Sequence, residues 1–114
     1  MRPDLLRGDV WEAEFDPVRG HEQAGRRSAM LISADRLHQG RSNLAYVVPM
    51  TGTDRGTPWH VPVEPPEAGL TARSFIMCDQ MRIFAVERLV RRRGRVSAAT
   101  LAEVEDRLRV LLDL

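Results

Sequence analysis

The chain has 114 residues, of which 43% are hydrophobic, and a formal net charge of +1 at neutral pH. This length and composition predict one domain with a packed core and exclude a disordered chain. The single cysteine, Cys78, excludes an internal disulfide and a zinc site built from cysteines. No apolar run approaches the ~18 residues that span a bilayer, and residues 1–4 carry no signal-peptide core. We therefore expect a cytoplasmic protein with no membrane partner.

The first half of the chain reads as strands joined by polar connections. Alternating apolar and polar residues predict a strand over 9–16, with Trp11 on its buried side. Asp16-Pro17 ends this strand, and a polar loop follows. The continuous apolar run over 28–33 is typical of a central strand. Residues 34–40 suit one helical turn or an irregular connection.

The middle of the chain predicts further short strands. Residues 43–50 form one, and its apolar face comprises Leu44, Tyr46, Val48 and Met50. Pro49 lacks a backbone N–H, which favours an edge position or a bulge near the end of that strand. Three more strands are predicted over 59–63, 73–79 and 83–90.

One convincing helix closes the chain, over about 97–113. Ser97 is a good N-cap, and one apolar stripe follows it, made of Leu101, Val104, Leu108 and Leu111. Glu103 with Arg107, and Glu105 with Arg109, have the spacing of surface ion pairs. Many short strands with one terminal helix predict a mainly β fold, a small curved antiparallel barrel over about 7–93 with the helix beside it. We expect residues 1–114 to form a single domain.

The densest group of polar residues lies in the loop between the first two predicted strands. Its sequence is Gly20-His21-Glu22-Gln23-Ala24-Gly25-Arg26-Arg27. Adjacent guanidinium groups offer planar forks of donors that fit a phosphate or a carboxylate. The loop therefore indicates a site for an anionic group.

The sequence lacks the patterns of the commoner phosphate chemistries. Its three histidines, His21, His38 and His60, are scattered, and no metal-ligand cluster, P-loop or nucleophile elbow is present. No metal or other cofactor is expected, so any transfer chemistry must come from ordinary polar side chains. RNA cleavage satisfies this condition, because the substrate supplies its own nucleophile, the 2′-hydroxyl.

Arg27 and Thr51 suit that chemistry because each lies at a junction between a strand and a loop. Arg27 can neutralise charge on a phosphoryl oxygen, and Thr51 can offer its hydroxyl to the same phosphate. If the strands over 28–33 and 43–50 are neighbours, these two ends meet at one rim of the barrel.

Several motifs occur in an order that resembles the MazF/PemK family of toxin endoribonucleases. They cover about residues 7–90 and are Arg7-Gly8-Asp9-Val10-Trp11, Asp16-Pro17, Gly20-x-Glu22-Gln23-x-Gly25-x-Arg27, Ala29-Met30-Leu31-Ile32-Ser33, Met50-Thr51 and Asp79-Gln80-Met81-Arg82. The resemblance implies an SH3-like barrel, a homodimer, a single-stranded RNA substrate and an acidic MazE-like antitoxin. It also implies that Arg27 and Thr51 are the catalytic pair.

Six further residues are candidates for contact with RNA: Glu22, Gln23, Arg26, Trp59, Gln80 and Arg82. Several of them have an alternative role. Glu22 can form an ion pair with Arg27 or secure its own loop, and Gln80 and Arg82 can be structural. The Thr51 hydroxyl can stabilise a turn.

Two other features leave alternatives open. The arginine-rich run over 91–95 is expected as a solvated turn more than as an RNA track. Position 28 is serine where the family commonly has proline, and losing the fixed φ of proline can loosen the placement of Arg27.

The leading hypothesis is a metal-independent endoribonuclease that leaves a 2′,3′-cyclic phosphate and a 5′-hydroxyl. One alternative is a non-catalytic poison, similar to the CcdB inhibitors of DNA gyrase. Another is an SH3-like RNA-binding module that leaves RNA intact. The sequence gives neither the cleavage motif nor the identity of the antitoxin.

Overall fold

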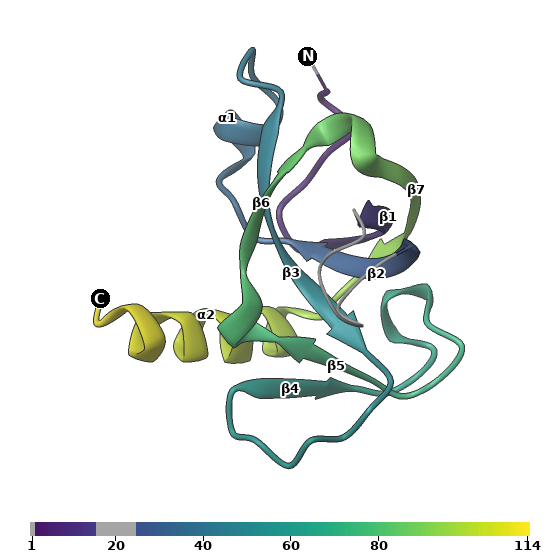
Figure 1. Cartoon of the computed structure of the whole chain (residues 1–114), viewed down its shortest axis with the longest axis vertical. Helices are drawn as coiled ribbons and strands as arrows, with labels where there is room; N and C mark the ends of the chain where they lie inside the picture. Colours follow the sequence, from purple (N-terminus) through teal and green to yellow (C-terminus); the bar gives the residue numbers. More distant parts are fainter. Residues whose placement is uncertain (1, 16–24) are drawn as a thin grey trace.

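The computed structural model describes residues 2–15 and 25–114, in which seven antiparallel strands and a terminal helix dominate (Figure 1). The strands are β1 Asp9–Phe15, β2 Gly25–Leu31, β3 Leu44–Thr51, β4 His60–Val63, β5 Ser74–Met77, β6 Arg82–Ala85 and β7 Leu89–Arg95. The helices are α1 Asp35–His38 and α2 Ala98–Leu112, with single 3-10 turns η1 Glu67–Gly69, η2 Cys78–Gln80 and η3 Val86–Arg88.

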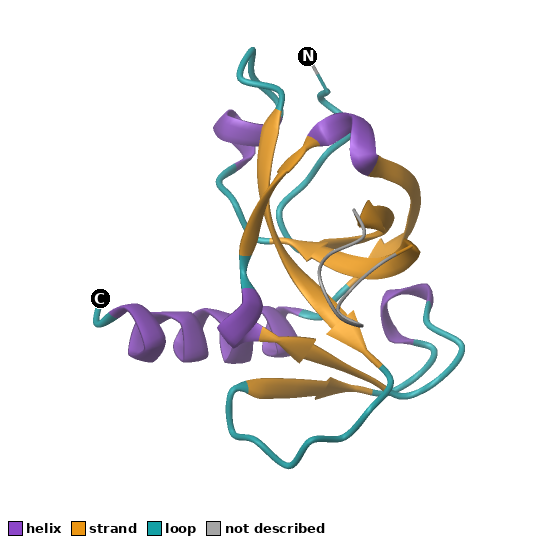
Figure 2. Ribbon diagram, viewed as in Figure 1, coloured by secondary structure: helices purple, strands orange, loops and turns teal. Residues whose placement is uncertain are grey.

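The strands form one strongly bent sheet in the order β4-β5-β3-β2-β1-β7, and β6 also pairs with β3. β3 is its central strand, because it pairs with β2 along one edge and with β6 and then β5 elsewhere. Figure 2 shows the strands curling around one another, with α2 lying across one side. The predicted fold class, mainly antiparallel β with a C-terminal helix, is confirmed.

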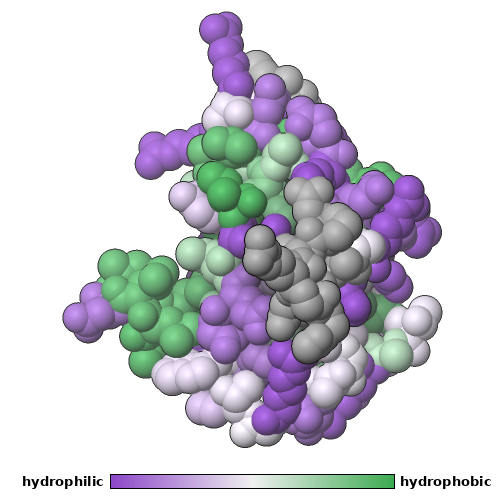
Figure 3. All heavy atoms as spheres, viewed as in Figure 1, coloured by the Kyte–Doolittle hydropathy of each residue, from purple (hydrophilic) through white to green (hydrophobic). Residues whose placement is uncertain are grey.

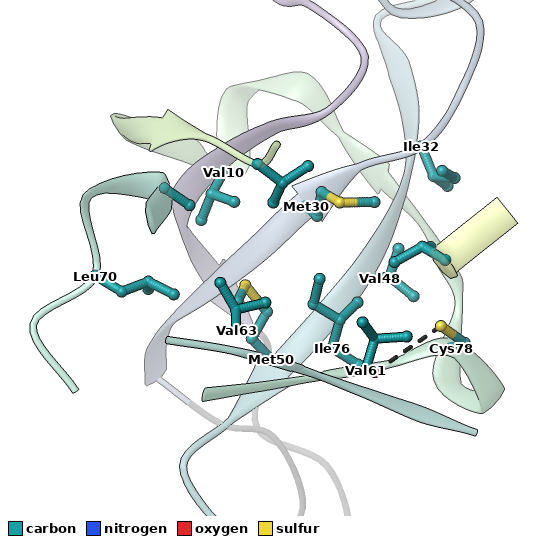
Figure 4. Packing of buried hydrophobic residues seen from close by; sticks show 13 residues of the cluster. Val10, Met30, Ile32, Val48, Met50, Val61, Val63, Leu70, Ile76 and Cys78 are labelled. Atoms are coloured by element: carbon teal, nitrogen blue, oxygen red, sulfur yellow. Dashed lines mark hydrogen bonds between the residues drawn. The ribbon is translucent and has the colours of Figure 1, made fainter. Parts of the chain in front are cut away.

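The bend divides the interior into two hydrophobic clusters. The first lies under α2 (Figure 4) and contains Val10, Met30, Ile32, Val48, Met50, Val61, Val63, Ala68, Leu70, Ile76, Cys78, Val96 and Val104. The second fills the curl of the other strands and contains Leu5, Trp11, Ala13, Phe15, Ala29, Leu31, Ala45, Val47, Phe84, Val86 and Leu89. β2 and β3 contribute to both clusters, because successive side chains of a strand point to opposite faces.

Helix α2 begins and packs as its sequence predicts. The Ser97 hydroxyl accepts a hydrogen bond from the backbone N–H of Thr100. Val104, on the face of α2 that packs against the sheet, is fully buried. The expected pair between Glu103 and Arg107 is present at 3.0 Å. Glu105 instead pairs with Arg7, which fastens the helix to the segment before β1.

Three expectations are wrong in detail. The strand predicted over 83–90 is broken by η3, because Val86 turns inward to a buried position there. The arginine-rich run over 91–95 is strand β7, paired with β1, and not a turn. Pro49 lies in a central strand and not at an edge.

The described residues include no helix long and apolar enough to cross a membrane.

Candidate active site at the open end of β2 and β3

β2 and β3 are paired along only part of their length. Residues 29–31 of β2 pair with residues 47–49 of β3, and the pairing stops at Pro49. Beyond Pro49, Met50 and Thr51 pair with β5 instead. The start of β2, Gly25 to Ser28, therefore continues along β1 alone, and the two strands separate.

A pocket of about 180 Å³ lies where the strands separate. It is lined by Arg26, Arg27, Ser28, Met50, Thr51, Gly52 and Ser74. The structure therefore brings together the two residues, Arg27 and Thr51, that the sequence predicted to meet if their strands were neighbours. Typical small-molecule sites occupy ~300–1,000 Å³, so this pocket suits a single group such as a phosphodiester.

The two arginines of the pocket differ in their surroundings. Arg27 is exposed, and within the described residues its guanidinium makes no hydrogen bond or ion pair. Arg26 is also exposed but lies 3.6 Å from a carboxylate oxygen of Glu12 on β1. No described residue therefore occupies the donors of Arg27, and toward this part of the chain they are available to an anion.

Thr51 ends β3 and is 9% exposed. Its Oγ1 accepts the backbone N–H of Thr53 at 3.2 Å, so the turn-forming role anticipated from the sequence is present. A hydroxyl has one donor as well as two acceptor positions. The same contact therefore fixes the side chain and leaves the hydroxyl proton available to a bound group.

The other predicted contact residues lie elsewhere. Glu22 and Gln23 fall outside the described residues. Trp59 is half-buried before β4, and neither it nor Gln80 lines the pocket. Arg82 also lies apart from the pocket, and its guanidinium carbon sits 5.2 Å from the ring centroids of both Phe15 and Phe84.

Two hydroxyls of the pocket were not identified as site residues from the sequence. Ser28 was identified only as a departure from a family pattern, and the structure gives it a place in the wall. Ser74 arrives from β5, far along the chain, and no local motif marks it. Only the pairing of β3 with β5 brings Ser74 to this position.

The surroundings of the cysteine thiol make it a poor nucleophile. Cys78 is buried, and desolvation raises the pKa of its thiol to about 11, so the thiol stays protonated at neutral pH and is a poor nucleophile. Among the described residues, no three histidine, cysteine or carboxylate groups are arranged to hold a metal ion.

The strongly bent antiparallel sheet, its terminal helix and this small arginine-lined pocket define a compact β domain with a candidate anion-binding site. Residues 6–112 match the family model described as PemK-like, MazF-like toxin of type II toxin–antitoxin system. The chain belongs to this family, as its motifs predicted.

Named relatives agree over almost the whole chain. Endoribonuclease MazF9 of Mycobacterium tuberculosis is 36% identical, with 96% of this chain and 98% of that protein covered. The crystal structure of MazF from Deinococcus radiodurans superposes with a TM-score of 0.80 at 28% identity, covering 95% of this chain and 96% of that one. A MazE–MazF complex from the same organism gives a TM-score of 0.77 at 29% identity, covering 94% of each chain.

Proposed function

We propose that this protein is an endoribonuclease toxin that cleaves single-stranded RNA in the cytoplasm without a metal ion. The observation that carries the proposal is the meeting of Arg27 and Thr51 in one pocket of phosphodiester size. The relatives named as endoribonucleases support the same activity.

The reaction requires only groups that the RNA and this pocket supply. The ribose 2′-oxygen attacks the adjacent phosphorus, and the bond from phosphorus to the 5′-oxygen breaks. The products are a 2′,3′-cyclic phosphate and a 5′-hydroxyl, with the 2′ proton lost and a proton gained by the 5′-oxygen. Arg27 stabilises the negative charge that develops on the phosphoryl oxygens, and the Thr51 hydroxyl donates to the same group.

Arginine is poorly suited to carry the proton itself, because a guanidinium group stays protonated in proteins. We therefore assign Arg27 mainly electrostatic work. Unpaired RNA is the expected substrate, because in-line attack needs a backbone that can rotate and bases that can splay outward.

The test is to incubate long single-stranded RNA with wild type and with Arg27→Ala, with and without EDTA, and to map the product ends. We expect discrete cuts that persist in EDTA, end in cyclic phosphate and are lost in the variant. Arg41→Ala is the matched control, because Arg41 is exposed beyond the opposite end of β3. Intact RNA with folded wild-type protein would overturn the proposal and favour a gyrase-type poison or a binding module.

We also propose that an acidic antitoxin segment inhibits the enzyme by occupying this pocket. Arg26 and Arg27, both exposed and the latter without a partner among the described residues, provide the complementary charge. The complex between MazE and MazF of Deinococcus radiodurans supports an antitoxin partner for this chain. An antitoxin that binds here competes with RNA, and its affinity falls in Arg27→Ala.

A homodimer is proposed from an apolar face that the single chain leaves uncovered. The apolar face of β3 is only half covered. Val48 and Met50 are buried under α2, whereas Leu44 and Tyr46 are exposed. Ile83 of β6 lies directly opposite Tyr46 and is 48% exposed.

The C-terminal end of α2 continues this face with Leu112 and Leu114, which are exposed. Figure 3 shows apolar surface at this end of the helix. Between helix and sheet lies a groove of about 300 Å³. Its walls are mainly apolar, from Ile32, Tyr46, Met81, Leu108, Leu112 and Leu114, and also include Arg7, Ser33, Glu105 and Arg109. A second copy of the chain is the occupant that the family resemblance implies. Contiguous apolar surface of this kind marks protein contacts.

The oligomeric state can be measured by analytical ultracentrifugation of wild type and Ile83→Asp. We expect a dimer for wild type and a folded monomer for the variant, because a buried unpaired carboxylate opposes association. Val90→Asp is the control, since Val90 is also exposed but lies on β7. A monomeric wild type at micromolar concentration excludes the dimer.

A further inference from the structure

We propose that the Ser28 hydroxyl is a third phosphate-binding group of the pocket, which donates a hydrogen bond to a phosphoryl oxygen beside Arg27 and Thr51. The inference rests on the proposed RNA cleavage. It assigns a phosphate contact to Ser28, at a position where the family commonly has proline.

Ser28 is the hydroxyl of the pocket whose hydrogen-bonding capacity is unused. It is half-buried in the pocket wall, and within the described residues its Oγ makes no hydrogen bond. Ser74 differs, because its hydroxyl already donates to the carbonyl of Ala72 at 3.1 Å. Thr51 accepts from the Thr53 backbone. A half-buried hydroxyl with a free donor is suited to a bound oxygen.

The charge of the pocket makes the bound oxygen anionic. Among the described residues, its lining includes two arginines and no carboxylate. Arg26 is partly neutralised by Glu12, so Arg27 supplies most of the uncompensated positive charge. A phosphoryl group in the transition state carries charge on more than one oxygen, and preorganised donors beyond a single guanidinium stabilise it further.

The backbone places Ser28 for this contact. Ser28 pairs with Glu12 of β1, and it is the last β2 residue before the ladder with β3 begins at Ala29. Ser28 therefore lies at the mouth of the opening between the strands. Its side chain is on the opposite face of β2 from that of Arg27, so the two reach a group bound in the opening from different sides. Proline at this position, as the family commonly has, offers neither the hydroxyl nor a backbone donor.

Ser28→Ala should lower the rate of the chemical step by roughly tenfold, as expected for loss of a hydrogen bond to a charged group. Ser28→Thr keeps the hydroxyl and suits a strand, so it should retain activity near that of wild type. A lost contact in the transition state lowers kcat, whereas a loosened fold lowers the unfolding midpoint, and both are measured.

The decisive experiment uses single-turnover cleavage of RNA with sulfur in place of each non-bridging oxygen at the mapped cut. Sulfur accepts hydrogen bonds poorly, so it removes the same contact as the mutation. If Ser28 donates to that oxygen, one diastereomer slows wild type by more than it slows Ser28→Ala, and the two changes are non-additive. Ser42→Ala is the control for hydroxyl loss, since Ser42 lies in an exposed turn far along the chain from the pocket.

The outcomes separate this inference from the proposed function. If wild type cuts RNA and both diastereomers slow Ser28→Ala as much as wild type, Ser28 makes no such contact while the nuclease assignment stands. If wild type leaves all RNA intact, the proposed function fails, and this inference fails with it.

Discussion

The arginines of the two strands that flank β1, β7 on one side and β2 on the other, illustrate how one residue type performs two different tasks. All 17 basic residues of the chain are arginines. On β7, Arg92 and Arg95 donate to the carboxylate of Asp9, which is fully buried, at 3.1 and 3.0 Å. At the open end of β2, Arg27 has no partner among the described residues.

The difference lies in the acid nearby and not in the arginine. A buried carboxylate requires compensating charge, so Arg92 and Arg95 are committed to holding β7 on β1. Arg91 is likewise paired with Glu12 at 3.1 Å. The run that looked most basic in the sequence is therefore largely neutralised, whereas no described carboxylate neutralises Arg27.

Breaking the committed pair should have the largest effect on stability. Arg92→Ala with Arg95→Ala leaves the Asp9 carboxylate buried without its partners. We expect a loss of about 3–5 kcal/mol in the free energy of unfolding, a large share of the ~5–15 kcal/mol typical of a domain. Urea denaturation followed by circular dichroism measures it.

Adding Asp9→Asn to that double variant provides the control. Removing the buried charge should restore part of the lost stability, because the neutral side chain no longer needs two cations. A double variant as stable as wild type would show that water, and not arginine, satisfies Asp9.

Removing the free arginine should have the opposite profile. Arg27→Ala is expected to change the free energy of unfolding by no more than about 0.5 kcal/mol, because it breaks no contact in the described structure. RNA cleavage should fall by ~10²–10³, or ~2.7–4 kcal/mol, as for loss of one charge-stabilising donor. A variant that loses stability instead of activity contradicts the contrast drawn between the two groups of arginines.

Much of the fold followed from local patterns. The alternation of β1, the apolar run of β2 and the capped stripe of α2 each depend on residues close together in the chain, so periodicity identified them. The error at 83–90 arose because a 3-10 turn with buried Val86 preserves the apolar pattern of a strand. Pro49 was misplaced because it lies between the β6 and β5 ladders of a central strand, where a missing N–H is tolerated, and only the pairing of the strands reveals this.

The site was predictable only in part, for a similar reason. Arg27 and Thr51 occupy strand ends that the motifs mark, and their meeting required one assumption about neighbouring strands. Ser74 depends on the pairing of β3 with β5, which no local pattern encodes. The sequence shows that Arg92 and Arg95 are cationic. That both pair with Asp9 follows from the burial of the Asp9 carboxylate, which the sequence does not show.

Thr51→Val tests the second member of the pocket with little change of shape. Loss of a hydrogen bond to a charged group should slow cleavage by about 10- to 100-fold, or ~1.5–3 kcal/mol. The Thr53 N–H loses its acceptor but is near solvent, so the unfolding free energy should fall by less than about 1 kcal/mol. Cleavage kinetics and urea denaturation on the same preparation separate the two effects, and unchanged kinetics restrict Thr51 to its turn.

Glu12→Gln addresses the residue that joins the two regions, and its effect should be the smallest. Glu12 lies between Arg26 of the pocket and Arg91 of β7, at 3.6 and 3.1 Å. Because these ion pairs are largely exposed on the arginine side, stability should fall by less than about 1 kcal/mol. Both guanidinium groups then become available to phosphates, so RNA affinity should rise. The slope of the logarithm of the binding constant against the logarithm of the salt concentration should steepen by ~0.7 per added contact.

Binding of 2′-O-methylated RNA, which lacks the attacking hydroxyl, measures this slope without cleavage. Glu103→Gln makes the same change in net charge on α2, where Glu103 pairs with Arg107, and should leave the slope unchanged. Equal slopes in both variants would mean that Arg26 and Arg91 gain no phosphate when Glu12 releases them, and that Arg27 acts without a wider arginine surface.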